Sequence, residues 1–185
     1  RAARLADERR HEEAAGVYIG LAAEAIGAER DRLTLLAVEQ WLDAGDTRRA
    51  QSAFSEVAPP ADPALRVLWN TNRAALLLWD GKPDEALDIL RPLASQPLTV
   101  SQRSRVDALR GDAWFQKNDP VRAVNLYLQL EQSLIDSDAI LATRERLWAG
   151  LLVSQPQVMR ASSQFTSSAI IRGWLELGSL AVSTG

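Results

Sequence analysis

The 185-residue sequence contains no cysteine and a single histidine. The lack of cysteine excludes disulfides, thiolate zinc sites and cysteine nucleophiles, and it leaves the redox compartment undetermined. The one histidine, His11, stands between Arg10 and Glu12 in a charged turn ahead of a helix. A lone histidine in such surroundings is usually a solvated surface group, and no second ligand or nucleophile stands near it. We therefore expect no metal or catalytic site at His11.

Long apolar runs and an excess of one charge are also missing. The longest apolar stretches, such as residues 74–79, fall far short of the roughly 18 residues needed to cross a bilayer. The 24 acidic and 21 basic side chains give a net charge of −3 and are mixed along the chain. This leaves no basic field that would attract nucleic acid. We expect a soluble chain, folded as one domain or one long helical array, with no nucleic-acid partner.

Sequence motifs of common active sites are absent too. The sequence has no G-x-G-x-x-G turn, no phosphate-binding loop and no G-x-S-x-G elbow. Acidic pairs at 12–13 and 84–85 fall in first helical turns, where negative charge complements the helix dipole. Asp136 and Asp138 have calcium-like spacing but lack the glycine and distal glutamate of a calcium loop. We expect no enzyme activity, cofactor or metal, and a hydrolase built on helices is the least favoured alternative.

What the sequence does contain is a repeat. An alanine followed four residues later by a large side chain occurs four times, and the alanines are 36, 36 and 37 residues apart. The pairs are Ala14/Tyr18, Ala50/Phe54, Ala86/Leu90 and Ala123/Tyr127. Five residues before each alanine lies a candidate helix end. Gly45, Gly81 and Asn118 are types that accept the left-handed conformation ending a helix, whereas the first unit has Arg9 there.

Each alanine is also preceded by a regular set of positions. Mostly small residues stand twelve positions upstream and large apolar residues stand nine and eight positions upstream. The small ones are Ala2, Val38, Ala74 and Gly111, and the large ones include Trp41, Leu77 and Trp114. Small residues let the two helices of a hairpin approach closely, and large ones fill the space between hairpins. Each unit is thus expected to be a helix, a tight turn and a second helix.

This pattern resembles the tetratricopeptide repeat over about residues 1–135. The resemblance implies an all-α, right-handed solenoid of antiparallel helical hairpins with about four to five repeats. The period exceeds the family's 34 residues by two or three, which we place in loops such as 59–63 and 95–97. We predict helices over 1–9, 11–25, 29–44, 47–57, 63–80, 83–94, 101–117, 120–132, 139–153 and 168–182. Residues 136–185 are expected to be atypical C-terminal helices of the same domain, leading to a further domain beyond this chain.

Counting the offsets that face the concave side of such arrays gives a candidate binding groove. Its residues are Arg32, Glu39, Asp43, Trp79, Arg105, Asp112 and Gln116. They could bind an extended peptide or another domain. Trp41 and Trp114 fall on packing positions and are expected in the core, whereas Trp79 is the aromatic residue of the groove. An ordinary solvated helix face is the competing interpretation.

The C-terminal part sharpens the resemblance. A helix with Arg144, Arg146, Leu147, Trp148 and Leu151 is followed by a Gly173-Trp174-Leu175-Glu176-Leu177 helix. Together with the repeats, this order of elements resembles the N-terminal helical domain of LpoA-type lipoprotein activators of penicillin-binding proteins. That family carries a lipid-bearing cysteine upstream and a periplasmic-binding-protein-like domain downstream. Neither is in this chain, so we expect it to be a fragment.

The resemblance implies a non-enzymatic scaffold. It would belong to a lipid-anchored protein in the periplasm, attached to the inner face of the outer membrane, that activates a class A, bifunctional penicillin-binding protein. Peptidoglycan is a second candidate partner. The alternative is a peptide-binding tetratricopeptide adaptor or chaperone that acts in assembly or secretion through the groove around Trp79.

Overall fold

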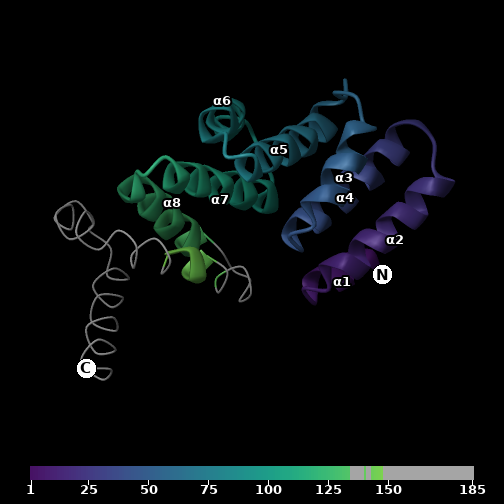
Figure 1. Cartoon of the computed structure of the whole chain (residues 1–185), viewed down its shortest axis with the longest axis horizontal. Coiled ribbons are helices and arrows are strands. Elements are labelled where there is room, and N and C mark those ends of the chain that lie inside the picture. The colour runs from purple at the N-terminus through teal and green to yellow at the C-terminus, as the bar shows by residue number, and fades with distance from the viewer. Residues whose placement is uncertain (134–139, 141–142, 148–185) are drawn as a thin grey trace. The chain divides into compact units, whose positions relative to one another are not determined.

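The computed structural model describes residues 1–133, 140 and 143–147. All regular secondary structure in these residues is helical, which confirms the predicted all-α class. The helices are α1 (Ala2–Asp7), α2 (His11–Glu24), α3 (Gly27–Asp43), α4 (Thr47–Ser55), α5 (Pro63–Trp79), α6 (Pro83–Ala94), α7 (Val100–Gln116) and α8 (Pro120–Ser133) (Figure 1). Most of the helix predicted over 139–153, and all of that over 168–182, lie outside the described residues.

Two compact units make up the chain, one of residues 1–109 and one of residues 110–185. In the first unit, helices that follow one another in sequence pack together from α1 to α6, and α3 also contacts α5. This is the sequential pairing expected of a helical repeat. The change to atypical helices expected at residue 136 falls among residues that the structure does not describe, so it stays a prediction.

The turns inside the hairpins repeat the same backbone geometry. In each of the four repeats, a residue in the left-handed conformation ends the first helix. Its φ is 57° at Arg9, 80° at Gly45, 70° at Gly81 and 58° at Asn118. The next residue's N–H bonds back to a carbonyl five residues earlier in every case, at 2.8 to 2.9 Å. This is the Schellman arrangement that closes helix ends. Arg9 therefore adopts the turn conformation that its residue type disfavours, and the predicted register holds in all four repeats.

The starts of the second helices follow their sequence signals. Asp46 accepts a bond from the Arg49 N–H at 3.0 Å, and Asp119 accepts one from the Arg122 N–H at 3.1 Å. Lys82 makes no side-chain cap bond, as expected of a cation at that position. Each carboxylate satisfies one of the backbone donors that a helix start leaves without a partner.

The repeated small residues lie where the helices meet. The four repeat alanines, at positions 14, 50, 86 and 123, are all 0% exposed. At Gly111, an added Cβ would stand 2.3 Å from Cε1 of Tyr127, so the α7 backbone touches the aromatic ring of α8 directly. These contacts confirm that small side chains set the spacing between neighbouring helices.

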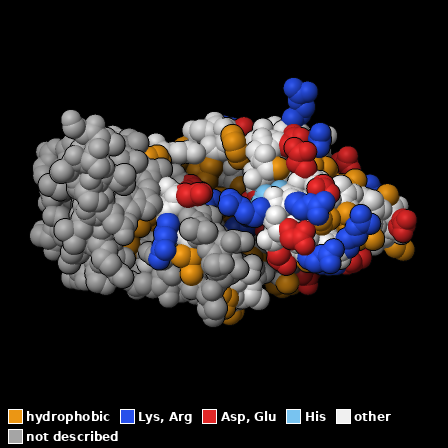
Figure 2. All heavy atoms as spheres, turned by 90° about the horizontal axis from the view of Figure 1, so that it is seen from below, with side chains coloured by type: hydrophobic (Ala, Val, Ile, Leu, Met, Phe, Trp, Pro, Cys, Tyr) orange, Lys and Arg blue, Asp and Glu red, His pale blue; other side chains and the backbone are white. Residues whose placement is uncertain are grey.

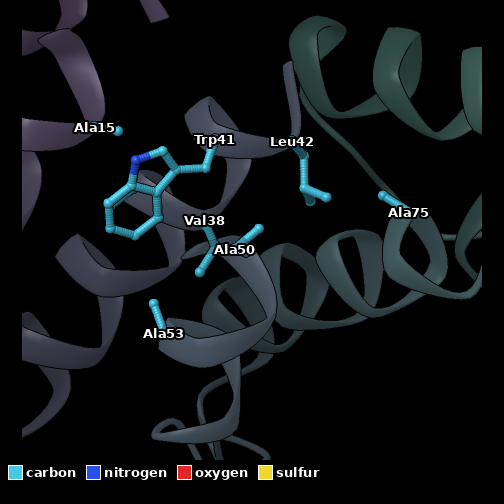
Figure 3. Packing of buried hydrophobic residues seen from close by; sticks show 8 residues of the cluster. Ala15, Val38, Trp41, Leu42, Ala50, Ala53 and Ala75 are labelled. Atoms are coloured by element: carbon cyan, nitrogen blue, oxygen red, sulfur yellow. The ribbon is translucent and has the colours of Figure 1, made fainter. Parts of the chain in front are cut away.

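Trp41 fills the space between hairpins in the first unit, as predicted. Its indole extends from α3 toward Ala15 of α2, with Ala50 and Ala53 of α4 nearby (Figure 3). It is 9% exposed. Large apolar surface buried in this way is the main source of stability in such stacks.

Trp114 departs from the core position predicted for it. The residue is only half-buried. Two cations cover the ring, because the Arg122 guanidinium lies 4.4 Å and the Lys117 ammonium 5.7 Å from its centroid. Contact between a cation and the face of an indole ring is favourable, so these two side chains give Trp114 polar company that Trp41 lacks in its alanine-lined cluster.

Candidate functional site

A groove of about 630 Å³ lies within the first unit, along most of α3 and the N-terminal parts of α5 and α7. Its lining residues are Ala28, Glu29, Arg32, Leu36 and Glu39 of α3, Asp62, Ala64, Leu65, Leu68 and Thr71 of α5 and its cap, and Ser101, Gln102 and Arg105 of α7. Every second helix, the first one of each successive hairpin, therefore contributes one face. The residues that share a face recur at helical spacing, such as 28, 32, 36 and 39 on α3.

The floor of the groove is apolar. Leu36, Leu65 and Leu68 provide it, and Leu68 also packs against the buried cluster around Trp69. The Thr71 hydroxyl does not offer its hydrogen to the groove, because it donates to the Val67 carbonyl at 2.6 Å. The floor thus presents hydrocarbon over a rigid core.

One wall carries a cluster of three charges that joins α3 to α7. The Arg105 guanidinium lies 3.0 and 3.1 Å from the two carboxylate oxygens of Asp43 and 3.6 Å from Glu39 Oε1. The side chains of Arg105 and Glu39 are each 22% exposed. Their mutual attraction is therefore screened less than that of a surface pair. Burial, and then the Glu39 charge, raise the pKa of nearby Tyr18.

A second ion pair lies at the mouth. Arg32 donates two hydrogen bonds to Glu29, both of 2.8 Å, and this bonding lowers the pKa of the Glu29 carboxyl. Asp62 caps α5 by accepting from the Leu65 N–H at 2.8 Å. Elsewhere on the surface, Figure 2 shows acidic and basic side chains interspersed over one face of the described part, with no large field of one sign.

The structure brings four of the seven predicted groove residues together. Arg32, Glu39 and Arg105 line the groove, and Asp43 binds Arg105 beside it. Trp79 stands at the last position of α5, 59% exposed, and is not among the lining residues. Its expected role as the aromatic contact of the groove stays a prediction without a place in this cavity.

The remaining two predicted residues belong to the second unit. Asp112 accepts a 2.6 Å hydrogen bond from the Tyr127 hydroxyl and lies 3.3 Å from the Arg146 guanidinium. Burial, and then the Asp112 charge, raise the pKa of Tyr127 well above its ordinary value. Gln116 is exposed at the end of α7. Asp112 thus holds α7 and α8 together through Tyr127.

Sequence reasoning identified the charged rim and missed the apolar floor. Leu36 lies one turn after Arg32 and one before Glu39, so the groove offsets already pointed to it. A leucine at helical spacing gives no signal of its own, because most such leucines lie in the core. Leu65 and Leu68 sit close to the loop before α5, where the repeat offsets are least regular.

The interpretation of His11 as a solvated surface group was wrong. The residue is partly buried at the start of α2, and its Nδ1 lies 2.9 Å from Oε1 of Gln40 on α3. Gln40 is buried, and a buried amide needs a partner, which the imidazole supplies. No group of three or more His, Asp or Glu side chains in the described residues is arranged to hold a metal ion.

Comparison with known proteins finds one matching protein family and similar solved structures. The profile of the family described as "LppC putative lipoprotein" matches residues 9–184. The amino-terminal domain of Escherichia coli LpoA is similar in structure, with a TM-score of 0.68 and 19% identity over 88% of this chain and 72% of that one. No protein in the curated set matches the chain.

A structure of Haemophilus influenzae LpoA is also similar. Its TM-score is 0.75 and its identity 19%, over 87% of this chain. The chain spans 30% of that protein's length. At this identity the likeness shows the fold, so the helices packed in sequential pairs match those of the LpoA amino-terminal domain.

Proposed function

The chain belongs to the LppC lipoprotein family, and from this premise we propose that it is the helical domain of an outer-membrane lipoprotein that activates a bifunctional penicillin-binding protein. The observation that carries the proposal is the family match over residues 9–184, joined to the LpoA fold over most of the chain. The resemblance to LpoA-type proteins is thereby confirmed at the level of family and fold. The activator role, the class A synthase as partner and the part that peptidoglycan plays belong to the proposal.

In this proposal the domain works as a non-enzymatic scaffold. The packing of the first unit supports it, because zero-exposure alanines and identical Schellman turns fix each helix against the next. A stack built in this way resists bending, since each hairpin is held by its neighbours. A stiff unit of this kind suits a protein that must hold a partner-binding part at a distance from its anchor.

The proposed location is the periplasm, at the inner face of the outer membrane, with a lipid as anchor. Membership of a lipoprotein family supports this placement. Among the described residues, no helix combines the length and the apolar character needed to span a bilayer. A lipid outside this chain would then supply the attachment.

Cross-linking in cells tests the proposal. The full-length protein, tagged at its C-terminus, is expected to fractionate with the outer membrane. After treatment with an amine-reactive cross-linker it should copurify with a class A penicillin-binding protein, and lose that partner when the lipid-bearing cysteine is replaced. A protein found in the cytoplasm, or one that never copurifies with a cell-wall synthase, would contradict the proposal.

A peptide-binding adaptor in assembly or secretion remains the second candidate. The groove favours it, because an open cavity of about 630 Å³ with an apolar floor has the size and lining of a ligand site. An adaptor would copurify with several unrelated clients, whereas an activator would copurify with one synthase.

A further inference from the structure

We propose that the groove between α3, α5 and α7 binds an extended polypeptide segment of a partner, and that this segment carries apolar side chains together with a lysine or arginine. The inference deepens the second candidate function by naming the residues of the groove and the chemistry of its ligand. It does not depend on the activator role, since the groove would select such a segment whichever protein presents it. Three features of the groove support it, namely its floor, its excess of carboxylates and its lack of aromatic side chains.

The floor determines that the ligand has apolar side chains. Leu36, Leu65 and Leu68 form a hydrocarbon surface at the bottom of a cavity of about 630 Å³. Covering such surface gains roughly 25 cal/mol per Å². An extended strand rises about 3.3 Å per residue and turns alternate side chains to one side. It can therefore place two or three apolar side chains on the leucines while its other side chains face the rim.

The charges determine that the ligand is cationic. The lining includes three carboxylates, of Glu29, Glu39 and Asp62, and two guanidiniums, of Arg32 and Arg105. Asp43 adds a fourth carboxylate beside Arg105. Glu39 and Asp43 are partly buried, with side chains 22% and 32% exposed, and opposite charges attract more strongly there than in bulk water. Glu39 has the least exposed of these carboxylates, and a basic side chain next to it would balance the excess negative charge.

The same residues disfavour a glycan strand. None of the lining residues is aromatic, so no flat face is present on which a sugar ring could stack. Two neutral polar groups are engaged within the protein, since Thr71 donates to Val67 and the Gln102 side-chain oxygen accepts from the Thr99 N–H at 3.0 Å. Hydroxyl groups brought onto the leucine floor would lose water without gaining partners. Peptidoglycan glycan is therefore a poor occupant, and a polypeptide is the fitting one.

A selection from random peptides tests the inference. The chain is immobilised, a phage-displayed library of twelve-residue peptides is passed over it, and the enriched peptides are synthesised and titrated by fluorescence anisotropy. We expect them to combine Leu, Ile or Val with Lys or Arg. Leu36→Gln should weaken binding about tenfold or more, because a polar side chain would replace one of the three leucines that contact the apolar side chains of the ligand. Glu39→Gln should weaken it about threefold, as expected for a partly exposed ion pair.

Matched controls separate binding from folding. Leu21→Gln changes an exposed leucine of α2 outside the groove and should leave the affinity unchanged. Leu36 is preferred to Leu68 because Leu68 also packs on the core. Leu36→Ala, with its milder change, replaces Leu36→Gln if circular dichroism shows lost helicity. Glu39→Gln leaves Arg105 bound to Asp43, so the ion pair that joins α3 to α7 is kept.

Several results would overturn the inference. One is a library that yields no peptide enriched over the bare support. Another is a set of peptides that are acidic or neutral, or that bind the Leu36 variant as well as the original chain. A third is binding of muropeptides from digested peptidoglycan that Leu36→Gln abolishes. The peptide selection contains no synthase, so a negative selection would leave the activator proposal intact. Likewise, evidence against the activator role would leave the inference about the groove intact.

Discussion

Substitution of Gly111 by alanine tests the packing rule at its tightest point. The new Cβ would stand 2.3, 2.8 and 2.9 Å from three ring atoms of Tyr127. The ring is 2% exposed, and its hydroxyl bonds to Asp112, so it cannot move aside freely. Overfilling of this kind costs typically about 1 to 3 kcal/mol. Alanine recovers about 1 kcal/mol of helix propensity, which leaves a net loss of up to about 2 kcal/mol.

Gly16→Ala supplies the matched control. Gly16 lies inside α2, and an added Cβ would meet no atom within 4 Å. The same chemical change should therefore stabilise the protein by up to about 1 kcal/mol through helix propensity alone. Urea unfolding followed by circular dichroism at 222 nm measures both variants. The two substitutions should shift the midpoint in opposite directions.

A second variant shows whether Tyr127 is the cause. In Gly111→Ala/Tyr127→Leu the ring is absent, so adding the methyl group should cost less than it does beside tyrosine. Equal stabilisation by Gly111→Ala and Gly16→Ala would refute the reasoning. So would an unchanged cost of the methyl group after Tyr127 is removed.

Arg9→Gly should stabilise the chain by about 0.5 to 1 kcal/mol, because the left-handed conformation strains a side chain more than the flexibility of glycine costs, and a lower urea midpoint would contradict this. Ala86→Trp should destabilise by about 1 to 3 kcal/mol or more, because the alanine is 0% exposed between helices, and an unaltered melting temperature would mean that the register is wrong. Tyr127→Phe should cost about 1.5 to 3 kcal/mol at neutral pH through loss of its bond to the Asp112 carboxylate. Because the pKa of Tyr127 is raised in the folded state, the folded protein keeps a proton that the unfolded chain releases near pH 10. The free energy of unfolding should therefore fall above that pH. Tyr127→Phe should flatten this fall in a pH series of urea titrations.

The repeat was predictable because its determinants are local. Small residues and turn residues act within a few positions of the chain, so Ala50 and Gly45 reveal a hairpin without knowledge of its neighbours. Arg9 shows the limit of this reasoning. Its residue type argues against the turn, yet the packing of α1 on α2 imposes the left-handed conformation there.

Interactions between distant helices were harder to foresee. His11 bonds to Gln40 across 29 positions, and the bond follows from a buried amide that only the fold reveals. Arg66 donates to the Pro60 carbonyl at 2.8 Å and Arg103 to the Gln96 carbonyl at 2.8 Å, so equivalent arginines fasten the loops before α5 and α7. Their spacing of 37 residues was a signal that the repeat search could have used.

The candidate site was predicted in its charges and missed in its floor. Arg105 and Asp43 stand 62 positions apart, and the repeat offsets placed them on one surface correctly. The repeat offsets also predict Trp79 on the concave side. Its position as the last residue of α5 leaves it outside the groove, because the lining residues of α5 and its cap lie between positions 62 and 71.

The central claim is that this domain belongs to an activator of peptidoglycan synthesis, and one measurement tests it most directly. A purified class A penicillin-binding protein from the same organism polymerises and cross-links lipid-linked precursor, with and without the full-length lipoprotein. The account predicts that the lipoprotein raises the rate of synthesis while producing no glycan when the synthase is absent. An unchanged rate at saturating lipoprotein would contradict it.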